Sequence, residues 1–132
     1  LDGTTVHHYW DGTYHLAGML ADQAHLIRAL IDASQNTGDA DLLVPAEKIA
    51  ERAIEEHKSK AGGFYDIQND PQSHGSMGRR NRSILDNAAM AEALMRLSHL
   101  ASCTLCRHQR MRGRVVVMFA HTLSVHDYNV TT

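Results

Sequence analysis

Residues 19–35 read MLADQAHLIRALIDASQ, and the spacing of their apolar side chains indicates the fold class. Positions three or four residues apart lie on one face of an α-helix. Small and apolar side chains occupy such positions, namely Leu20, Ala24, Ile27, Ile31 and Ser34, flanked by Leu26, Leu30 and Ala33. This broad stripe predicts an amphipathic helix over 19–35.

A glycine turn and a second helical pattern follow this stretch. Gly38 suits the left-handed position just after a helix C-terminus. Asp41 is placed to cap a second helix, and Pro45 is tolerated in its first turn. The apolar stripe of this helix lies opposite a charged face and consists of Ile49, Ala50, Ala53 and Ile54. Helix, tight turn and helix together predict an antiparallel hairpin.

The second half of the chain predicts another helical hairpin. Ser83 and Asp86 have the spacing of a capping box, with Asp in place of Glu, and helical spacing then continues to about Leu100. We expect a fourth helix over 107–124, although the β-branched residues from Val115 onward also suit a strand. The sequence therefore predicts one all-α domain over 1–132, made of two antiparallel helical hairpins with about four helices.

Between the predicted hairpins, glycine, asparagine and proline interrupt the chain. Residues 60–82 are therefore expected to form a long Gly-rich loop, in which only 64–67 has an ordered or extended pattern. A loop of this length inside a compact domain tends to be functional or mobile. Residues 125–132 are expected to form a loose tail.

The formal net charge of the 132 residues is -2, but the two halves have opposite signs. Residues 1–70 carry a net charge of -7, and residues 71–132 carry +5, all of the latter bases being Arg. We expect the acidic half to bind these arginines, either within one chain or between copies. No apolar stretch approaches the roughly 20 residues that a bilayer requires, so no membrane partner is expected.

The only cysteines are Cys103 and Cys106, which are too close in sequence for a disulfide to hold a fold together. Their spacing suits a redox pair or half of a zinc site, but a structural zinc site needs four ligands. We expect no metal and no cofactor, and weigh a redox role against ordinary unreactive cysteines. The chain starts at Leu1, which suggests a piece of a longer protein, and a cytoplasmic location is the expectation.

Aromatic and acidic residues gather in two short stretches. Trp10 and Tyr14 lie close to Asp22 in sequence, and Tyr65 is followed by Asp66. Aromatic faces stack on sugar rings and carboxylates bind hydroxyl groups, so these five residues are candidates for a carbohydrate site. The simpler interpretation is that the aromatic rings are buried at the end of a hairpin.

Histidines and arginines give weaker functional signals. The ten histidines match no catalytic or metal motif, so we expect them mainly at the surface. Two arginine clusters, at 79–82 and 107–114, have the chemistry to bind phosphate. The pI near 6.6 and the lack of aromatics beside these clusters argue against nucleic acid as the partner.

Five motifs follow one another at 9–12 (YWDG), 18–24 (GMLADQA), 37–39 (TGD), 62–66 (GGFYD) and 84–94 (ILDNAAMAEAL). Over residues 4–100 they resemble the helical part of the thioredoxin-domain-containing proteins typified by spermatogenesis-associated thioredoxin-like proteins. In that family a thioredoxin-like domain precedes a toroid of paired helices, similar to the N-acylglucosamine 2-epimerase and six-hairpin glycosidase folds. The resemblance implies that this chain supplies about two hairpins of an (α/α) toroid.

The chain also departs from that family. A thioredoxin-like domain is not among these 132 residues, so its redox role is not carried over. Residues 101–117 are unlike the family pattern, which a divergent or frame-altered segment would explain.

The leading hypothesis is a non-catalytic helical module related to a carbohydrate-associated toroid, acting by self-assembly or weak ligand binding. Two hairpins taken from a toroid expose apolar flanks, so we expect a homo-oligomer, with a dimer favoured. Two alternatives stay open: a sugar-acting enzyme with epimerase-like or hydrolase-like acid/base chemistry once assembled, and a Cys-based redox or metal-binding module. We do not expect catalysis from this chain alone.

Overall fold

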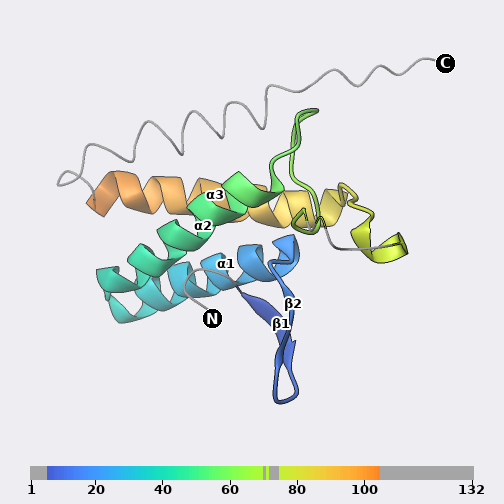
Figure 1. Cartoon of the computed structure of the whole chain (residues 1–132). Helices are drawn as coiled ribbons and strands as arrows, with labels where there is room; N and C mark the ends of the chain where they lie inside the picture. Colours follow the sequence, from blue (N-terminus) through green and yellow to red (C-terminus); the bar gives the residue numbers. More distant parts are fainter. Residues whose placement is uncertain (1–5, 70, 72–74, 105–132) are drawn as a thin grey trace.

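The computed structural model describes residues 6–69, 71 and 75–104. Three α-helices form the body: α1 (Leu20–Thr37), α2 (Leu43–His57) and α3 (Ile84–Thr104). A hairpin of two short strands, β1 (His7–Trp10) and β2 (Tyr14–Ala17), precedes α1 and projects from the helices (Figure 1). Two 3-10 turns, η1 (Ala40–Leu42) and η2 (Gly75–Gly78), complete the described elements.

Helix α1 confirms the prediction made from its apolar stripe. Its buried residues are Leu20, Gln23, Ala24, Ile27, Ile31 and Ser34. Gly38 ends the helix in the left-handed conformation, with φ of 74°, and its N–H donates to the carbonyl of Ser34 at 2.9 Å. A residue with a Cβ is strained at such a φ, which is why glycine suits this position.

The expectation that Asp41 caps the second helix is wrong. The carboxylate of Asp39, and not of Asp41, accepts a backbone hydrogen bond, from the N–H of Asp41 at 2.9 Å. This contact caps η1, and α2 begins only at Leu43 without a side-chain cap. Pro45 does lie in the first turn of α2.

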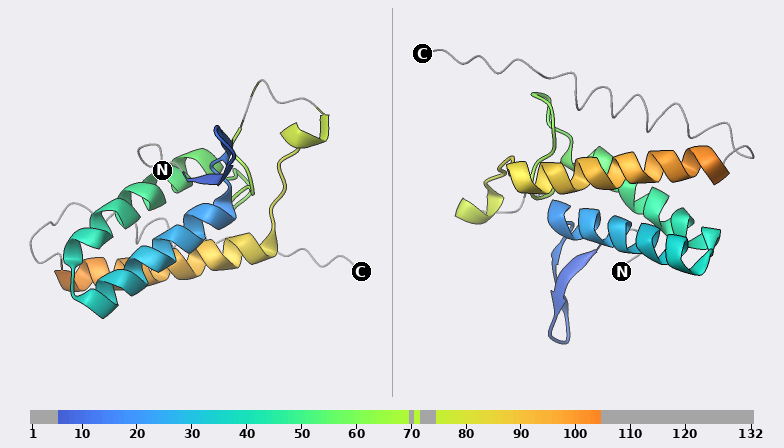
Figure 2. Two further views of the ribbon diagram at one scale, coloured as in Figure 1. Left: turned by 90° about the horizontal axis from the view of Figure 1, so that it is seen from below. Right: turned by 180° about the vertical axis from the view of Figure 1, so that it is seen from behind.

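Helix α3 begins as predicted and extends further than expected. The hydroxyl of Ser83 accepts from the N–H of Asp86 at 3.3 Å, and the helix continues to Thr104. Helices α1 and α3 run in the same direction and α2 runs against both (Figure 2). Arg96 of α3 forms an ion pair with Asp32 of α1, so part of the basic half does bind the acidic half within the chain.

The segment after α2 folds back onto that helix. Lys58 and Phe64 form an antiparallel bridge, and the N–H of Tyr65 donates to the carbonyl of His57 at 2.8 Å. The ordered pattern expected at 64–67 is confirmed, because Phe64 is 3% exposed and belongs to the core. The start of the predicted long loop is thus part of the packed structure.

Asn87 joins this returning segment to α3. Its Oδ1 accepts from the N–H of Phe64 at 2.7 Å, while its Nδ2 donates to the carbonyls of Phe64 at 2.9 Å and Ser83 at 2.8 Å. The side chain therefore pairs with the backbone of Phe64 as a neighbouring strand would. A Cβ on Gly63 would lie 2.7 Å from this Oδ1, so the approach requires glycine.

The β-hairpin was not predicted from the sequence. Its turn places Gly12 at φ of 114°, and Asp11 accepts from the N–H of Thr13 at 3.3 Å. Paired residues across the strands are His7 with Ala17, Tyr9 with His15, and Trp10 with Tyr14. The Asp-Gly turn was the available signal, but strands of four residues leave little alternation to detect.

The core lies between the three helices, with α1 packed against both others. Its largest fully buried side chains are Leu20, Ile27, Ile31, Ile49, Met90, Leu97 and His57. The expected all-α class is confirmed, with the small hairpin as an addition. The expected fourth helix at 107–124 and the tail at 125–132 lie outside the described residues. No helix among those described is long and apolar enough to cross a membrane.

We expect Asn87→Ala to lower the free energy of unfolding by about 2–4 kcal/mol, because three hydrogen bonds are lost and the amide and carbonyl of Phe64 stay buried. Urea denaturation measures this loss. The matched control is Asn36→Ala, which removes one exposed hydrogen bond to Asp32. A loss below about 1 kcal/mol in both variants would contradict the role assigned to Asn87.

Candidate functional site

One end of the helical body brings together most of the candidate residues. The N-terminal ends of α1 and α3 and the C-terminal end of α2 meet there, next to the hairpin (Figure 1). The N–H of Leu20 at the start of α1 donates to the carbonyl of Asp66 at 2.9 Å. The two stretches that contain the candidate residues, 10–22 and 65–66, therefore lie at the same end of the molecule.

The carboxylate of Asp66 holds two backbone segments together by hydrogen bonds. Its Oδ1 accepts from the N–H of Ile67 at 2.9 Å and from the N–H of Asn81 at 2.8 Å. The N–H of Asp66 itself donates to the carbonyl of Asn81 at 2.8 Å. These contacts fix the 80–82 segment against 65–67, which is a structural role for a residue predicted to bind ligand.

Arg80 lies against the predicted ligand residue Tyr65. Its guanidinium carbon is 4.0 Å from the centre of the tyrosine ring. The same guanidinium donates to the carbonyls of Ile67 at 3.1 Å and Glu56 at 3.2 Å. One face of Tyr65 is therefore occupied by a cation and is not open to a sugar ring. Arg80 belongs to the cluster at 79–82 that has the chemistry to bind phosphate, and in the structure it joins 65–67 to α2.

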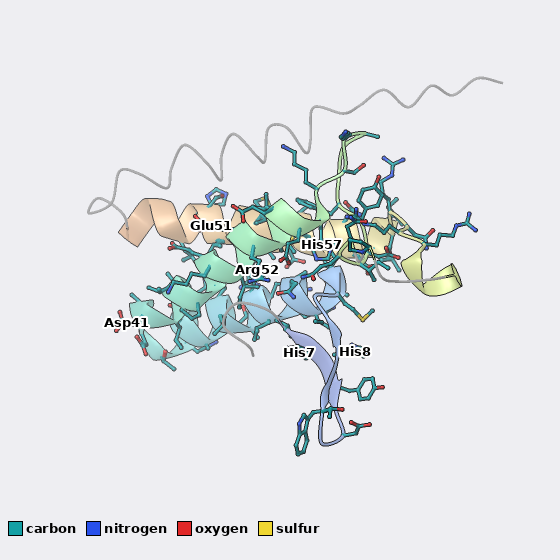
Figure 3. All side chains as sticks on the ribbon, viewed as in Figure 1. His7, His8, Asp41, Glu51, Arg52 and His57 are labelled. Carbon is teal, nitrogen blue, oxygen red and sulfur yellow. The ribbon has the colours of Figure 1, made fainter. Side chains whose placement is uncertain are left out.

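The carboxylate of Asp22, in the first turn of α1, is bound to the hairpin. Nδ1 of His8 lies 2.9 Å from its Oδ2, and the exposed fractions of the two side chains are 49% for His8 and 21% for Asp22. Figure 3 shows His8 on the hairpin and His57 at the end of α2. Asp22 and Asp66 come to one end of the body, but each has its own protein partner. They do not form the facing pair of free acids that a glycosidase uses.

Two aromatic side chains of the hairpin face solvent. Trp10 is 67% exposed and Tyr9 is 50% exposed. The interpretation that these rings are buried at a hairpin end is wrong for both, because a projecting two-stranded ribbon has no layer to cover them. Tyr14 pairs with Trp10 through the backbone, and its side chain lies outside the description.

His57 is buried, which corrects the expectation of surface histidines at this position. Its Nδ1 lies 2.8 Å from the carbonyl of Tyr65, so this nitrogen carries the proton in the neutral ring. Burial lowers the pKa of His57 below 6.5, and the nearby Arg80 adds to this, against raising contributions from the bond to Tyr65 and from Glu56 and Asp66. The signal was present in the sequence, because His57 continues the buried stripe after Ala53 and Ile54.

The remaining candidates gain little support. Cys103 lies in the last turn of α3 without a described side chain, and Cys106 and the 107–114 arginines lie outside the described residues. Within 6–69, 71 and 75–104, no three His, Cys, Asp or Glu residues are placed to hold a metal ion. A shallow depression of about 290 Å³ on α2 is lined only by charged side chains, Lys48, Glu51, Arg52, Glu55 and Glu56.

Comparison with known proteins identifies the fold and no more. No protein-family model matches the sequence, and no curated protein matches it. The structure is similar to the crystal structure of unsaturated glucuronyl hydrolase from Bacillus sp. GL1, with a TM-score of 0.67 and 20% sequence identity. The match covers 95% of this chain and 35% of the hydrolase, which is an (α/α) toroid of the six-hairpin glycosidase superfamily. The chain thus has the fold of part of such a toroid and spans about a third of that protein's length.

We expect stability to depend on pH through His57. The folded-state pKa of His57 is below 6.5, so the unfolded chain binds the proton more readily than the folded chain. The contribution of the neutral ring to the free energy of unfolding is therefore fully present above pH 6.5. The contribution of His57 to the free energy of unfolding is lost as pH falls from 6.5 towards the folded-state pKa. The free energy of unfolding should then fall by up to about 1.4 kcal/mol per pH unit.

Urea denaturation between neutral and mildly acidic pH measures this slope. His57→Asn should flatten it, since the amide keeps a donor for Tyr65 without titrating. Asn36→Ala, at an exposed position of α1 that does not titrate, should keep the wild-type slope. An unchanged slope in His57→Asn would show that other groups cause the pH dependence.

Proposed function

We propose that the chain is a non-catalytic module of the (α/α) toroid type that binds carbohydrate weakly through its projecting hairpin. The observation that carries this proposal is the exposure of Trp10 and Tyr9 on a hairpin that is fixed to α1 by the contact between His8 and Asp22. The similar hydrolase is described as responsible for the degradation of glycosaminoglycan, which supports a sugar as the ligand class.

Exposed aromatic rings on a held backbone suit sugar binding. Stacking against a pyranose removes apolar surface of both partners from water without requiring the ring to move. The side chain of His8 is half exposed and adds a polar group that can bind a hydroxyl while its Nδ1 contacts Asp22. Because Tyr9 and Trp10 are consecutive in β1, their side chains lie on opposite faces of the ribbon, and Trp10 shares its face with His8. One apolar ring beside a polar group suits a shallow sugar site.

The state of the two candidate acids supports binding without catalysis. Asp66 uses Oδ1 for two backbone hydrogen bonds, and Asp22 is bound to His8. A glycosidase needs one acid that donates a proton and a second that is free to act as base or nucleophile. The alternative, a sugar-acting enzyme once assembled, would require these carboxylates to exchange partners. A Cys-based redox or metal function stays a prediction, tested by thiol titration of Cys103→Ser.

Membership of the thioredoxin-domain-containing family is also a proposal. Three of its five motifs touch one another at the same end of the body, although they are far apart in sequence. Gly18 packs under Gln68, which follows the GGFYD motif, and Gly63 and Phe64 contact Asn87 of the motif at 84–94. Motifs that contact one another in the folded chain serve the same structural purpose. Members of one family would be expected to keep such motifs together.

Saturation-transfer NMR tests sugar binding directly. We expect signals from at least one member of a panel of mono- and disaccharides that includes uronic acids and glycosaminoglycan disaccharides. Trp10→Ala should abolish these signals, because the exposed indole supplies the stacking face. Quenching or a spectral shift of the single tryptophan of the chain should follow the same sugars.

The matched control is Val44→Ala, which removes an exposed apolar side chain at the start of α2. It should keep the wild-type signals. No signal with any sugar, or equal signals in wild type and Trp10→Ala, would contradict the proposal. Cleavage or epimerisation of a panel sugar that depends on Asp22 would favour the enzyme alternative.

Self-assembly is the second part of the proposal, and α3 is the surface that supports it. Ile84 and Leu85 are about three-quarters exposed, and Met95 is 42% exposed. These side chains lie on a helix whose other side is already buried against α1. A second copy of the chain would cover this surface, as a neighbouring hairpin does in a complete toroid.

Sedimentation velocity tests assembly. We expect a dimer for the wild type at micromolar concentration and a shift towards monomer for Met95→Glu, since a charge would be buried in the interface. Val44→Glu, on α2, should leave the dimer intact. A monodisperse, cooperatively folded wild-type monomer would rule out the dimer.

A further inference from the structure

The contact between His8 and Asp22 fixes which nitrogen of the His8 ring carries the proton. Nδ1 of His8 lies 2.9 Å from Oδ2 of Asp22, and an ionised carboxylate only accepts hydrogen bonds. The neutral ring therefore places its proton on Nδ1, which leaves Nε2 without one. Figure 3 shows His8 on the hairpin, and 49% of its side chain is exposed. Nε2 is thus a hydrogen-bond acceptor that a ligand can reach.

Trp10 lies beside this acceptor on the ribbon. Residues two positions apart in a strand share a face and are separated by about 6.4–6.8 Å along the strand. His8 and Trp10 are such a pair in β1, and Trp10 is 67% exposed. This separation is comparable to the breadth of a pyranose ring with its hydroxyl groups. A sugar stacked on Trp10 would therefore bring a group on its edge to Nε2 of His8.

The charges near this face of the hairpin are negative. The sequence contains no lysine or arginine before Arg28, whereas Asp11 directly follows Trp10 and Asp22 lies in the first turn of α1. Asp22 contacts the ring of His8 itself. A carboxylate or sulfate group on a sugar would meet an acceptor nitrogen and two like charges here, which is unfavourable.

We propose that the face of β1 with His8 and Trp10 selects neutral sugars that present a hydroxyl or amide N–H donor to Nε2 of His8, and disfavours uronic acids and sulfated sugars. This inference rests on the sugar-binding function proposed above and adds the substrate class. Trp10 supplies the apolar contact, and His8 supplies the selective acceptor. Asp22 is a positioning residue, because it acts on the ligand only by holding the tautomer of His8.

Nitrogen-15 NMR of the histidine rings tests the tautomer without any sugar. At about pH 8.5, well above the usual titration range of histidine, we expect Nδ1 of His8 to carry the proton in the wild type. Asp22→Asn keeps an acceptor for Nδ1–H and should retain this tautomer, whereas Asp22→Ala should give a mixture of both. A wild-type ring with its proton on Nε2 would overturn the proposal.

Saturation-transfer titrations with fluorinated sugars test the selectivity. For a neutral sugar that binds the wild type, each hydroxyl group is replaced in turn by fluorine, which cannot donate a hydrogen bond. We expect replacement at one position to weaken binding about two- to tenfold, the usual effect of one lost hydrogen bond. His8→Ala should bind the parent sugar and this analogue equally. The matched control, His99→Ala at an exposed position of α3, should keep the wild-type difference.

Uronic acids give the second comparison. The wild type should bind the neutral sugar about two- to fivefold more tightly than the matching uronic acid, which is the usual strength of exposed charge–charge interactions. Asp22→Asn should narrow this difference, because it removes one of the two like charges and keeps the tautomer of His8.

The outcomes separate this inference from the proposed function. If no sugar binds, the sugar site and its selectivity are both wrong. Binding that depends on Trp10 but is unaffected by His8→Ala and by fluorine at every position would overturn the selectivity alone. Tighter binding of uronic acids than of neutral sugars would do the same.

Discussion

The hydrogen bonds between Asn87 and the backbone of Phe64 are the constraint on which the rest of the structure depends. They fix the segment after α2 to α3, and Gly63 is the residue that lets the two approach. Once Phe64 is held, Tyr65 reaches His57 and Asp66 reaches the start of α1. One amide side chain on α3 therefore determines how all three helix ends meet, through a segment that has almost no regular secondary structure.

Much of the helical fold was predictable from the sequence, because helix periodicity depends on neighbours within two turns. The stripe from Leu20 to Ile31, the left-handed Gly38 and the Ser83 cap are local features, and the structure confirms them. The hairpin and the cap by Asp39 were missed, since strands of four residues and a choice between two nearby aspartates leave weak local signals. The Asn87 contact joins residues 23 positions apart, which no periodicity indicates.

The sequence pointed to the stretches that contain the candidate residues, but it did not predict what each side chain does. The two stretches that carry the aromatic and acidic candidates lie at the same end of the body, where Leu20 donates to the carbonyl of Asp66. Sequence alone could not separate side chains that hold backbone, such as Asp66, from those that face solvent, such as Trp10. That distinction depends on tertiary contacts, which leave Trp10 exposed on the hairpin and use Asp66 to hold backbone.

The segment after α2 belongs to the cooperative core of the helical body and is not a loop on its surface. Native-state hydrogen exchange tests this most directly, because it reports the opening free energy of each amide. We expect the amides of Leu20, Phe64 and Tyr65 to exchange as slowly as those of the buried helix centres, and the hairpin amides to exchange faster. Fast exchange at Phe64 and Tyr65, independent of global unfolding, would contradict it.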